Sequence, residues 1–229
     1  PSAADLFSNS KINLENELEI IKSYSILERV VRNQNLTRSV IEVGKVKESL
    51  VIDFPFTIEN IITDDSIKTN MLFKISLEDN LLIITDFLKK EKTNEFVFKN
   101  FSTHGVKHSL PFDISNVDYD SWTNDYILSF NTVDDVVINL KESIIVTPVG
   151  KKSEIININY KSTNPEYARI VLNELIYVFN DDGIKDRQLI HKRTIEFVNS
   201  RYFFLSLELD SIEITKQLFK VKNDLVDLK

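Results

Sequence analysis

The last 45 residues of the chain, 185–229, contain neither glycine nor proline, and this absence is the strongest constraint on the fold. Both residues interrupt helices, so their absence from so long a stretch predicts one long helix. Apolar residues recur there at alternating spacings of three and four, interrupted only by Lys216, which is the pattern of a coiled-coil seam. The seam residues are Ile195, Val198, Tyr202, Leu205, Leu209, Ile212 and Phe219.

More apolar residues lie beside this seam and widen the apolar surface of the helix. We therefore expect part of the helix to pack on a globular base or on neighbouring copies. At 1.5 Å per residue it would reach about 60 Å, so we also expect it to project from the body. The alternative is an ordinary antiparallel helix of a soluble bundle. The additional residues are Phe203, Leu207, Ile214 and Leu218.

Composition excludes several classes of site and partner. The chain has no cysteine, so it can form no disulfide, no zinc–thiolate site and no cysteine nucleophile. The net charge is -7, and residues 185–229 carry +2 against -9 for the remainder. A strongly acidic body without a basic, aromatic-rich patch argues against a nucleic-acid partner. Hydrophobic residues make up 42% of the chain, which is enough for a core.

Upstream of the long helix the pattern predicts an α+β fold. A helix is expected from Leu14 to Asn33, with Asn13 as its cap, and then a strand near Ser39 to Val43. Alternation of apolar and polar residues then predicts a β-rich region shaped as a small sandwich or partly open barrel. Its expected strands are Ile52 to Ile58, Phe73 to Leu77, Leu81 to Phe87, Glu95 to Phe101, Tyr126 to Phe130 and Val136 to Leu140.

After the β-rich region the sequence again predicts both strands and a helix. Strands are expected from Ser143 to Val149 and from Ser153 to Tyr160. Asn164-Pro165-Glu166 combines a cap, a first-turn proline and an acidic residue, which predicts the start of a helix. We expect that helix to end near Asn180, with Gly183 as its terminator. The predicted division is an α/β base of residues 1–48 and 143–184, a β-rich insert of residues 49–142, and the long helix of residues 185–229.

Three ordered blocks of sequence resemble a known family. The first is Asn16-Glu17-Leu18-Glu19-Ile20-Ile21-Lys22-Ser23. The second joins Val146-Thr147-Pro148-Val149 to Asn164-Pro165-Glu166-Tyr167-Ala168, and the third begins Thr194-Ile195-Glu196-Phe197-Val198-Asn199-Ser200-Arg201. Together they resemble the periplasmic domain of bacterial polysaccharide co-polymerases, the Wzz chain-length determinants and the Wzc-type tyrosine autokinases.

This resemblance implies a scaffold. It implies an inner-membrane protein whose copies form a periplasmic ring that regulates the length or export of a capsular polysaccharide or exopolysaccharide. Its partners would be copies of itself, the polysaccharide, and the polymerase and export machinery. Members of that family carry this region between two membrane spans, so the resemblance implies that two spans flank this chain. The longest apolar runs within the chain fall far short of the roughly 20 residues that cross a bilayer. In Wzc-type members the kinase follows the second span, so no enzyme is expected within these residues.

Residues able to carry chemistry are few. His104 and His108 are four apart in a strand-rich stretch, where that spacing does not converge on a metal, so a surface pair is expected. Gly44-Lys45 and Gly150-Lys151-Lys152 lack the remaining residues of a phosphate-binding loop. We therefore expect no catalytic, cofactor or metal site. A glycosidase pair among Asp118, Asp120, Asp134 and Asp135 would need two carboxylates across a cleft, which spacing cannot establish.

A local concentration of aromatic residues offers a second interpretation of the chain. Tyr119, Trp122 and Tyr126, with polar residues between them, suit a surface that stacks on sugar rings, and they are the candidate glycan contacts. The chain would then be a carbohydrate-binding module. The alternative, which we favour, is that these aromatics anchor the core and its loops. A third possibility, an adaptor of the membrane-fusion class, is disfavoured because such proteins carry two long helices and this sequence predicts one.

Overall fold

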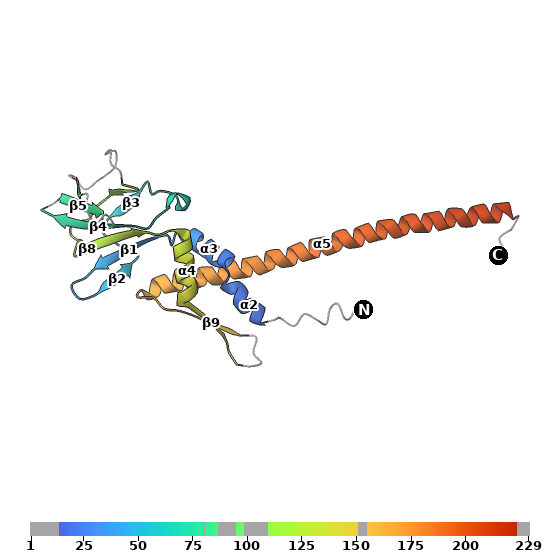
Figure 1. Ribbon diagram of the computed structural model, residues 1–229, viewed down its shortest axis with the longest axis horizontal. Coiled ribbons are helices and arrows are strands. Elements are labelled where there is room, and N and C mark those ends of the chain that lie inside the picture. Colours follow the sequence, from blue (N-terminus) through green and yellow to red (C-terminus); the bar gives the residue numbers. More distant parts are fainter. Residues whose placement is uncertain (1–13, 80, 87–94, 99–109, 151–154, 224–229) are drawn as a thin grey trace. The chain divides into compact units, whose positions relative to one another are not determined.

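The computed structural model describes residues 14–79, 81–86, 95–98, 110–150 and 155–223 (Figure 1). Helices and antiparallel sheets are combined in these residues, and a long helix ends them, which confirms the α+β class. The chain divides into two units, Pro1–Phe179 and Asn180–Lys229, which are described separately. His104 and His108 lie outside the described residues.

The predicted helix from Leu14 to Asn33 is two helices, α2 (Leu14–Ile21) and α3 (Tyr24–Asn33). The break falls at Ser23, whose backbone is extended with φ -66° and ψ 151°. Its hydroxyl oxygen accepts a hydrogen bond from the backbone N–H of Ile26 at 3.4 Å. A serine that caps a new helix in this way competes with continuation of the preceding one, so the single-helix prediction was wrong at this point.

The strand predicted from Val136 to Leu140 is part of a helix, α4 (Val133–Ser143). Thr132 caps it by accepting a hydrogen bond from the backbone N–H of Asp135 at 3.2 Å, and its own hydroxyl donates to the Asp135 carboxylate at 2.9 Å. This reciprocal cap resembles a capping box and outweighs the weak β preference of the valines. The buried positions follow a helical spacing, and they are Val136, Val137 and Leu140.

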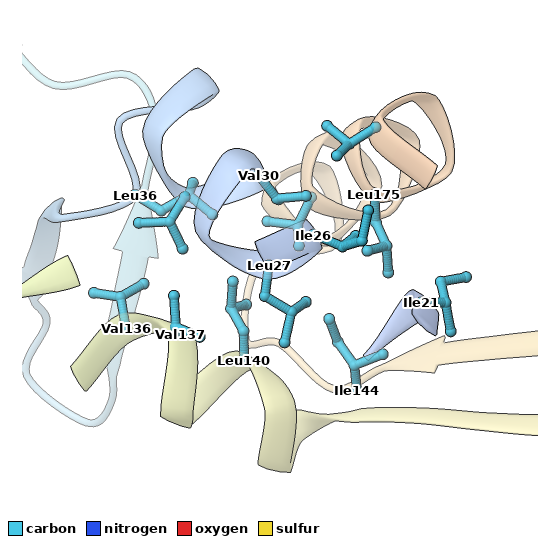
Figure 2. Close-up of a cluster of buried hydrophobic side chains, with 13 residues drawn as sticks. Ile21, Ile26, Leu27, Val30, Leu36, Val136, Val137, Leu140, Ile144 and Leu175 are labelled. Carbon is cyan, nitrogen blue, oxygen red and sulfur yellow. The ribbon is translucent and has the colours of Figure 1, made fainter. Parts of the chain in front are cut away.

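These helices enclose the first of two hydrophobic cores. Figure 2 shows side chains of α3 and α4 pointing toward one another, with Leu175 from the first turns of α5 (Pro165–Lys222) beside them. The hairpin of β9 (Ile144–Pro148) and β10 (Ile156–Tyr160) contributes Ile144 to the same core. Burying several fully enclosed aliphatic side chains, each worth about 1.5 to 3 kcal/mol, holds these segments together.

The second core lies on a six-stranded antiparallel sheet. In the order of the sheet its strands are β2 (Glu48–Val51), β1 (Arg38–Val43), β8 (Asp125–Phe130), β4 (Met71–Glu78), β5 (Leu81–Asp86) and β6 (Glu95–Phe98). Val40, Leu128 and Phe73 are opposite one another across three strands, and all three are buried. The strands predicted around Phe73, at Leu81 to Phe87 and at Tyr126 to Phe130 correspond to β4, β5 and β8, and the first of them was predicted from period-two alternation.

A short ribbon of β3 (Thr57–Glu59) and β7 (Asp113–Ser115) shares this second core through Ile114. The strand predicted from Ile52 to Ile58 was wrong for most of its length, since β2 ends at Val51 and β3 begins at Thr57. Pro55 explains the gap, because proline cannot donate a ladder hydrogen bond. Phe54 and Phe56 still pack on the core. The alternation of apolar residues therefore indicated buried positions correctly, but it did not indicate a strand.

The two cores divide the chain differently from the predicted base and insert. Val40 of β1 lies in the core of the sheet, although it was assigned to the base. Val137 of α4 lies in the helical core, although it was assigned to the insert.

Helix α5 spans 58 residues. Its start was predicted correctly, because the Asn164 side-chain oxygen accepts from the backbone N–H groups of Glu166 at 2.9 Å and Tyr167 at 3.1 Å. The expected end near Asn180 was wrong, since the helix continues through Gly183 without interruption. A glycine ends a helix when it adopts the left-handed conformation itself, and Gly183 does not, because strong helix formers follow it and continue the helix.

Candidate functional site

The candidate glycan residues do not form one surface. Tyr126 lies on β8 and is only 4% exposed, Trp122 is half-buried, and Tyr119 is exposed. The Trp122 ring packs on Phe56 with ring centroids 5.5 Å apart and meets Tyr126 edge to face at 5.2 Å. Two aromatic neighbours occupy this ring on the core side, so its placement favours the core-anchor interpretation.

A turn between β7 and β8 fixes the position of Trp122. The Asp118 carboxylate accepts hydrogen bonds from the Ser121 hydroxyl at 2.7 Å and from the backbone N–H of Asp120 at 3.1 Å. The hydrogen bond from Ser121 lowers the pKa of Asp118 below its ordinary value. The backbone N–H of Asp118 donates to the Pro55 carbonyl at 2.8 Å, which attaches the turn to the chain between β2 and β3.

Beside this turn lies a polar cleft of about 390 Å³. Its Glu42 carboxylate accepts from the Asn124 amide at 2.8 Å and from the Thr123 hydroxyl at 3.4 Å. Burial, and after it the charge of Glu42, raises the pKa of Tyr126. Carboxylates and hydroxyls can bind sugar hydroxyls, and the lining contains no cation, so the cleft suits a neutral glycan better than an acidic one. The lining residues are Glu42, Asp53, Phe54, Pro55, Asp118, Ser121, Thr123 and Tyr126.

The structure does not bring the four aspartates together as a glycosidase pair. Asp118 lines the polar cleft, whereas Asp134 and Asp135 line a separate hollow of about 480 Å³ near the start of α4. Asp134 accepts a hydrogen bond from the Tyr24 hydroxyl, which raises the pKa of that tyrosine. Asp135 belongs to the cap of α4. Each of these three carboxylates therefore has a structural partner.

A third hollow, of about 250 Å³, is mainly apolar and lies among the turn after α3, the strands β1, β2, β3 and β8, and the first turns of α5. Arg38 lies at its lining and donates to the Asp64 carboxylate at 3.0 Å and to the Ile62 carbonyl at 2.9 Å. Thr37 donates to the same carboxylate at 2.7 Å. This half-buried network joins β1 to the loop before β4.

The second unit presents a different kind of surface. From Ile184 to Val221, seventeen large apolar side chains on α5 are exposed, and the least exposed of them, Leu189, is 46% accessible. The seven predicted seam residues are all among them, so the seam is an exposed apolar stripe on α5. An exposed apolar surface of this extent marks a site of interaction with another molecule or with more of a larger assembly.

A second stripe on the same helix was missed from the sequence. Its members occupy the positions of the seam displaced by two residues, with Ser200 and Ser211 interrupting the apolar run, and this displacement places them on nearly the opposite face. The signal was present in the sequence, but Leu207, Ile214 and Leu218 were interpreted only as a broadening of the first stripe. The exposed members of this second stripe are Phe197, Phe204, Leu207, Ile214, Leu218 and Val221.

No family model and no curated protein matches this chain. Within the described residues no helix is long and apolar enough to cross a membrane. The part of the chain that the structure describes also contains no cluster of metal-ligating side chains, and His191 is a single exposed histidine on α5.

Proposed function

We propose that this chain is the scaffold domain of a polysaccharide co-polymerase, and that copies of it associate through the exposed helix of the second unit. Its parent would be a bacterial inner-membrane protein with this domain in the periplasm, regulating the length or export of a capsular polysaccharide or exopolysaccharide. The observation that carries the proposal is the uncovered apolar surface between Ile184 and Val221. The three ordered blocks of sequence that resemble the co-polymerases supply the biological setting.

Self-association follows from the physical chemistry of this surface. Burying apolar area gains roughly 25 cal/mol per Å², and large aromatic and aliphatic side chains supply most of the area on this helix. A scaffold of this kind needs no bond-making residue, because it acts by holding copies beside one another. Membrane anchors would raise the local concentration of the copies, so the chain without anchors should associate more weakly than its parent.

Sedimentation equilibrium of the chain over a range of concentrations tests the proposal. We expect concentration-dependent oligomers, and we expect Leu205→Glu with Leu209→Glu to remove the part of the association that uses the seam. Both residues are exposed in the second unit, so the melting of the first unit should stay unchanged. The matched control is Arg193→Glu with Gln217→Glu, which adds the same two glutamates away from the seam. A chain that stays monomeric at every concentration would contradict the proposed assembly.

The membrane setting has a separate test in the parent protein. A reporter inserted at Lys45, in the turn between β1 and β2, should be active only if its position is periplasmic. A cytoplasmic signal would reject the proposed topology while leaving self-association untouched.

A carbohydrate-binding module is the second candidate, and the polar cleft beside Tyr126 favours it. Its test is a calorimetric titration of the chain with neutral and acidic polysaccharides. Binding of a neutral glycan that is lost in Glu42→Ala would support a direct glycan site.

A further inference from the structure

The seam on α5 carries charges on both flanks that can select the direction of a partner helix. When Ile195 is placed at position a of a heptad, the flanking positions are e and g. Lys192 and Glu213 then occupy e positions, and Arg201 and Glu208 occupy g positions. All four side chains are exposed, and none takes part in an ion pair among the described residues.

A parallel partner of the same sequence would be opposed by these charges. In a parallel, in-register pair each g residue lies beside the e residue of the next heptad on the other copy. Glu208 would then meet Glu213 of the second copy, and this repulsion would occur twice. Lys216, which interrupts the seam, would also face Lys216 of the second copy inside the contact. Like charges at these positions disfavour the arrangement.

An antiparallel partner satisfies both the apolar residues and the charges. In that direction a positions face d positions, while g faces g and e faces e. With Tyr202 opposite Leu205 of the second copy, Ile195 lies opposite Ile212 and the intervening layers are all apolar. Four opposite-charge pairs then flank the contact, because each pair occurs twice by symmetry. These pairs are Arg201 with Glu208 and Lys192 with Glu213 of the second copy.

The charges also select one register. Sliding one copy by a heptad in one direction places Arg201 against Arg201 of the second copy, and sliding it in the other places Glu208 against Glu208. In the favoured register like charges meet only beyond the central segment, where Arg187 lies beside Lys222 of the second copy. The contact is therefore confined to residues 192–215.

We propose that the seam of one copy binds the seam of a second copy antiparallel, with the twofold axis between Phe203 and Phe204. This inference rests on the proposed self-association and adds the direction, the register and the pairing residues. It has a consequence for a ring of parallel copies in one membrane. Their lateral contacts would fall on the second stripe, on nearly the opposite face, and the seam would remain open to a helix that runs the other way.

Single cysteines test the direction directly, because the chain has no cysteine of its own. We expect Ile195→Cys and Ile212→Cys, each alone and mildly oxidised, to give no disulfide-linked dimer. In the antiparallel pair, two copies of residue 195 are about 25 Å apart, given 1.5 Å per residue. An equal mixture of the two variants, one carrying a mass tag, should give the mixed disulfide in high yield.

Each outcome of the cross-linking experiment tests the direction of the two helices, their register or the self-association itself. Disulfides within each single variant would overturn the antiparallel direction and leave self-association standing. A mixed disulfide from Ile195→Cys with Phe219→Cys, in place of Ile195→Cys with Ile212→Cys, would overturn the register. Absence of any disulfide, with monomers in sedimentation, would overturn both this inference and the proposed assembly.

Charge reversal provides an independent readout that needs no cysteine. Arg201→Glu should weaken the dimer about tenfold, because it places a glutamate beside Glu208 of the second copy on both sides of the twofold axis. Adding Glu208→Arg should restore the original affinity. Arg193→Glu is the matched control and should leave the dimer unchanged, since position 193 lies away from the seam. Failure of the double variant to recover would count against the pairing.

Discussion

The ring of Trp122 meets the ring of Tyr126 edge to face, with centroids 5.2 Å apart, at the border of the sheet core. Trp122 comes from the turn that Asp118 organises, and Tyr126 from the strand β8. The contact therefore joins a loop to the sheet. It also distinguishes two roles for Trp122, a platform for sugar rings and an anchor of the core. A platform for sugars needs an uncovered ring face, whereas an anchor needs partners on the core side.

We expect Trp122→Ala to lower the free energy of unfolding by about 2 to 3 kcal/mol, because the half-buried ring loses its contacts with Phe56 and Tyr126. Urea unfolding of the two proteins measures the difference. Tyr119→Ala in the same loop is the matched control and should change the stability by less than about 0.5 kcal/mol, since that side chain is exposed. An unchanged unfolding curve for Trp122→Ala, together with lost binding of a polysaccharide, would promote the carbohydrate-binding candidate.

Two neighbouring aspartates offer a matched comparison of ion pairs. Asp64 is 12% exposed and bonds both Arg38 and Thr37, whereas Asp65 is 79% exposed and bonds Arg32 at 3.0 Å. Asp64→Ala should cost about 2 to 4 kcal/mol, because it leaves the half-buried guanidinium of Arg38 without its counter-charge.

In contrast, Asp65→Ala should cost less than about 1 kcal/mol, as is usual for a solvent-exposed pair. Thermal and urea unfolding of both variants measure the costs. Equal losses of stability in the two variants would show that burial does not govern these ion pairs.

The sequence predicted those features whose causes are local. The cap at Asn164 needs only three consecutive residues, and the strand around Phe73 needs only alternation, so both could be predicted. The helix at Val136 was missed because a run of valine and isoleucine was interpreted as a strand, whereas the cap at Thr132 favours a helix. Residue patterns of strand and helix overlap over such short segments.

The candidate site was harder to predict than the fold because its contacts are distant in sequence. Phe56 and Trp122 are far apart along the chain, and no local pattern brings their rings together. The seam could be predicted, because residues on one face of a helix recur at fixed spacings within a single segment of the sequence. The second stripe, beginning at Phe197, could have been found by applying the heptad spacing of the seam from a starting point two residues later.

Gly183 lies within α5, and an alanine there should strengthen the helix. A Cβ atom at this position would meet Arg187 Nη2 at 3.7 Å, which is an ordinary contact, so no steric cost opposes the change. Alanine is more favourable than glycine in a helix by about 1 kcal/mol. Amide hydrogen exchange of residues 180–190 should slow by roughly fivefold in Gly183→Ala. Exchange that stays the same or becomes faster would contradict the helical state of this segment.

The stability of the first unit should fall at alkaline pH because of Tyr167. Burial, and after it the neighbouring Tyr160, raises the pKa of Tyr167 to about 12 from its ordinary value near 10. Below pH 10 the phenol is protonated in both the folded and the unfolded chain, so its contribution to stability is fully present. Between pH 10 and 12 the unfolded chain loses the proton first, and stability should decrease by up to about 1.4 kcal/mol per pH unit. Urea midpoints measured from pH 9 to pH 11.5 test this slope. Tyr167→Phe should remove most of it and leave the part due to Tyr160, whose pKa burial also raises. An identical slope in Tyr167→Phe would show that another group governs the alkaline transition.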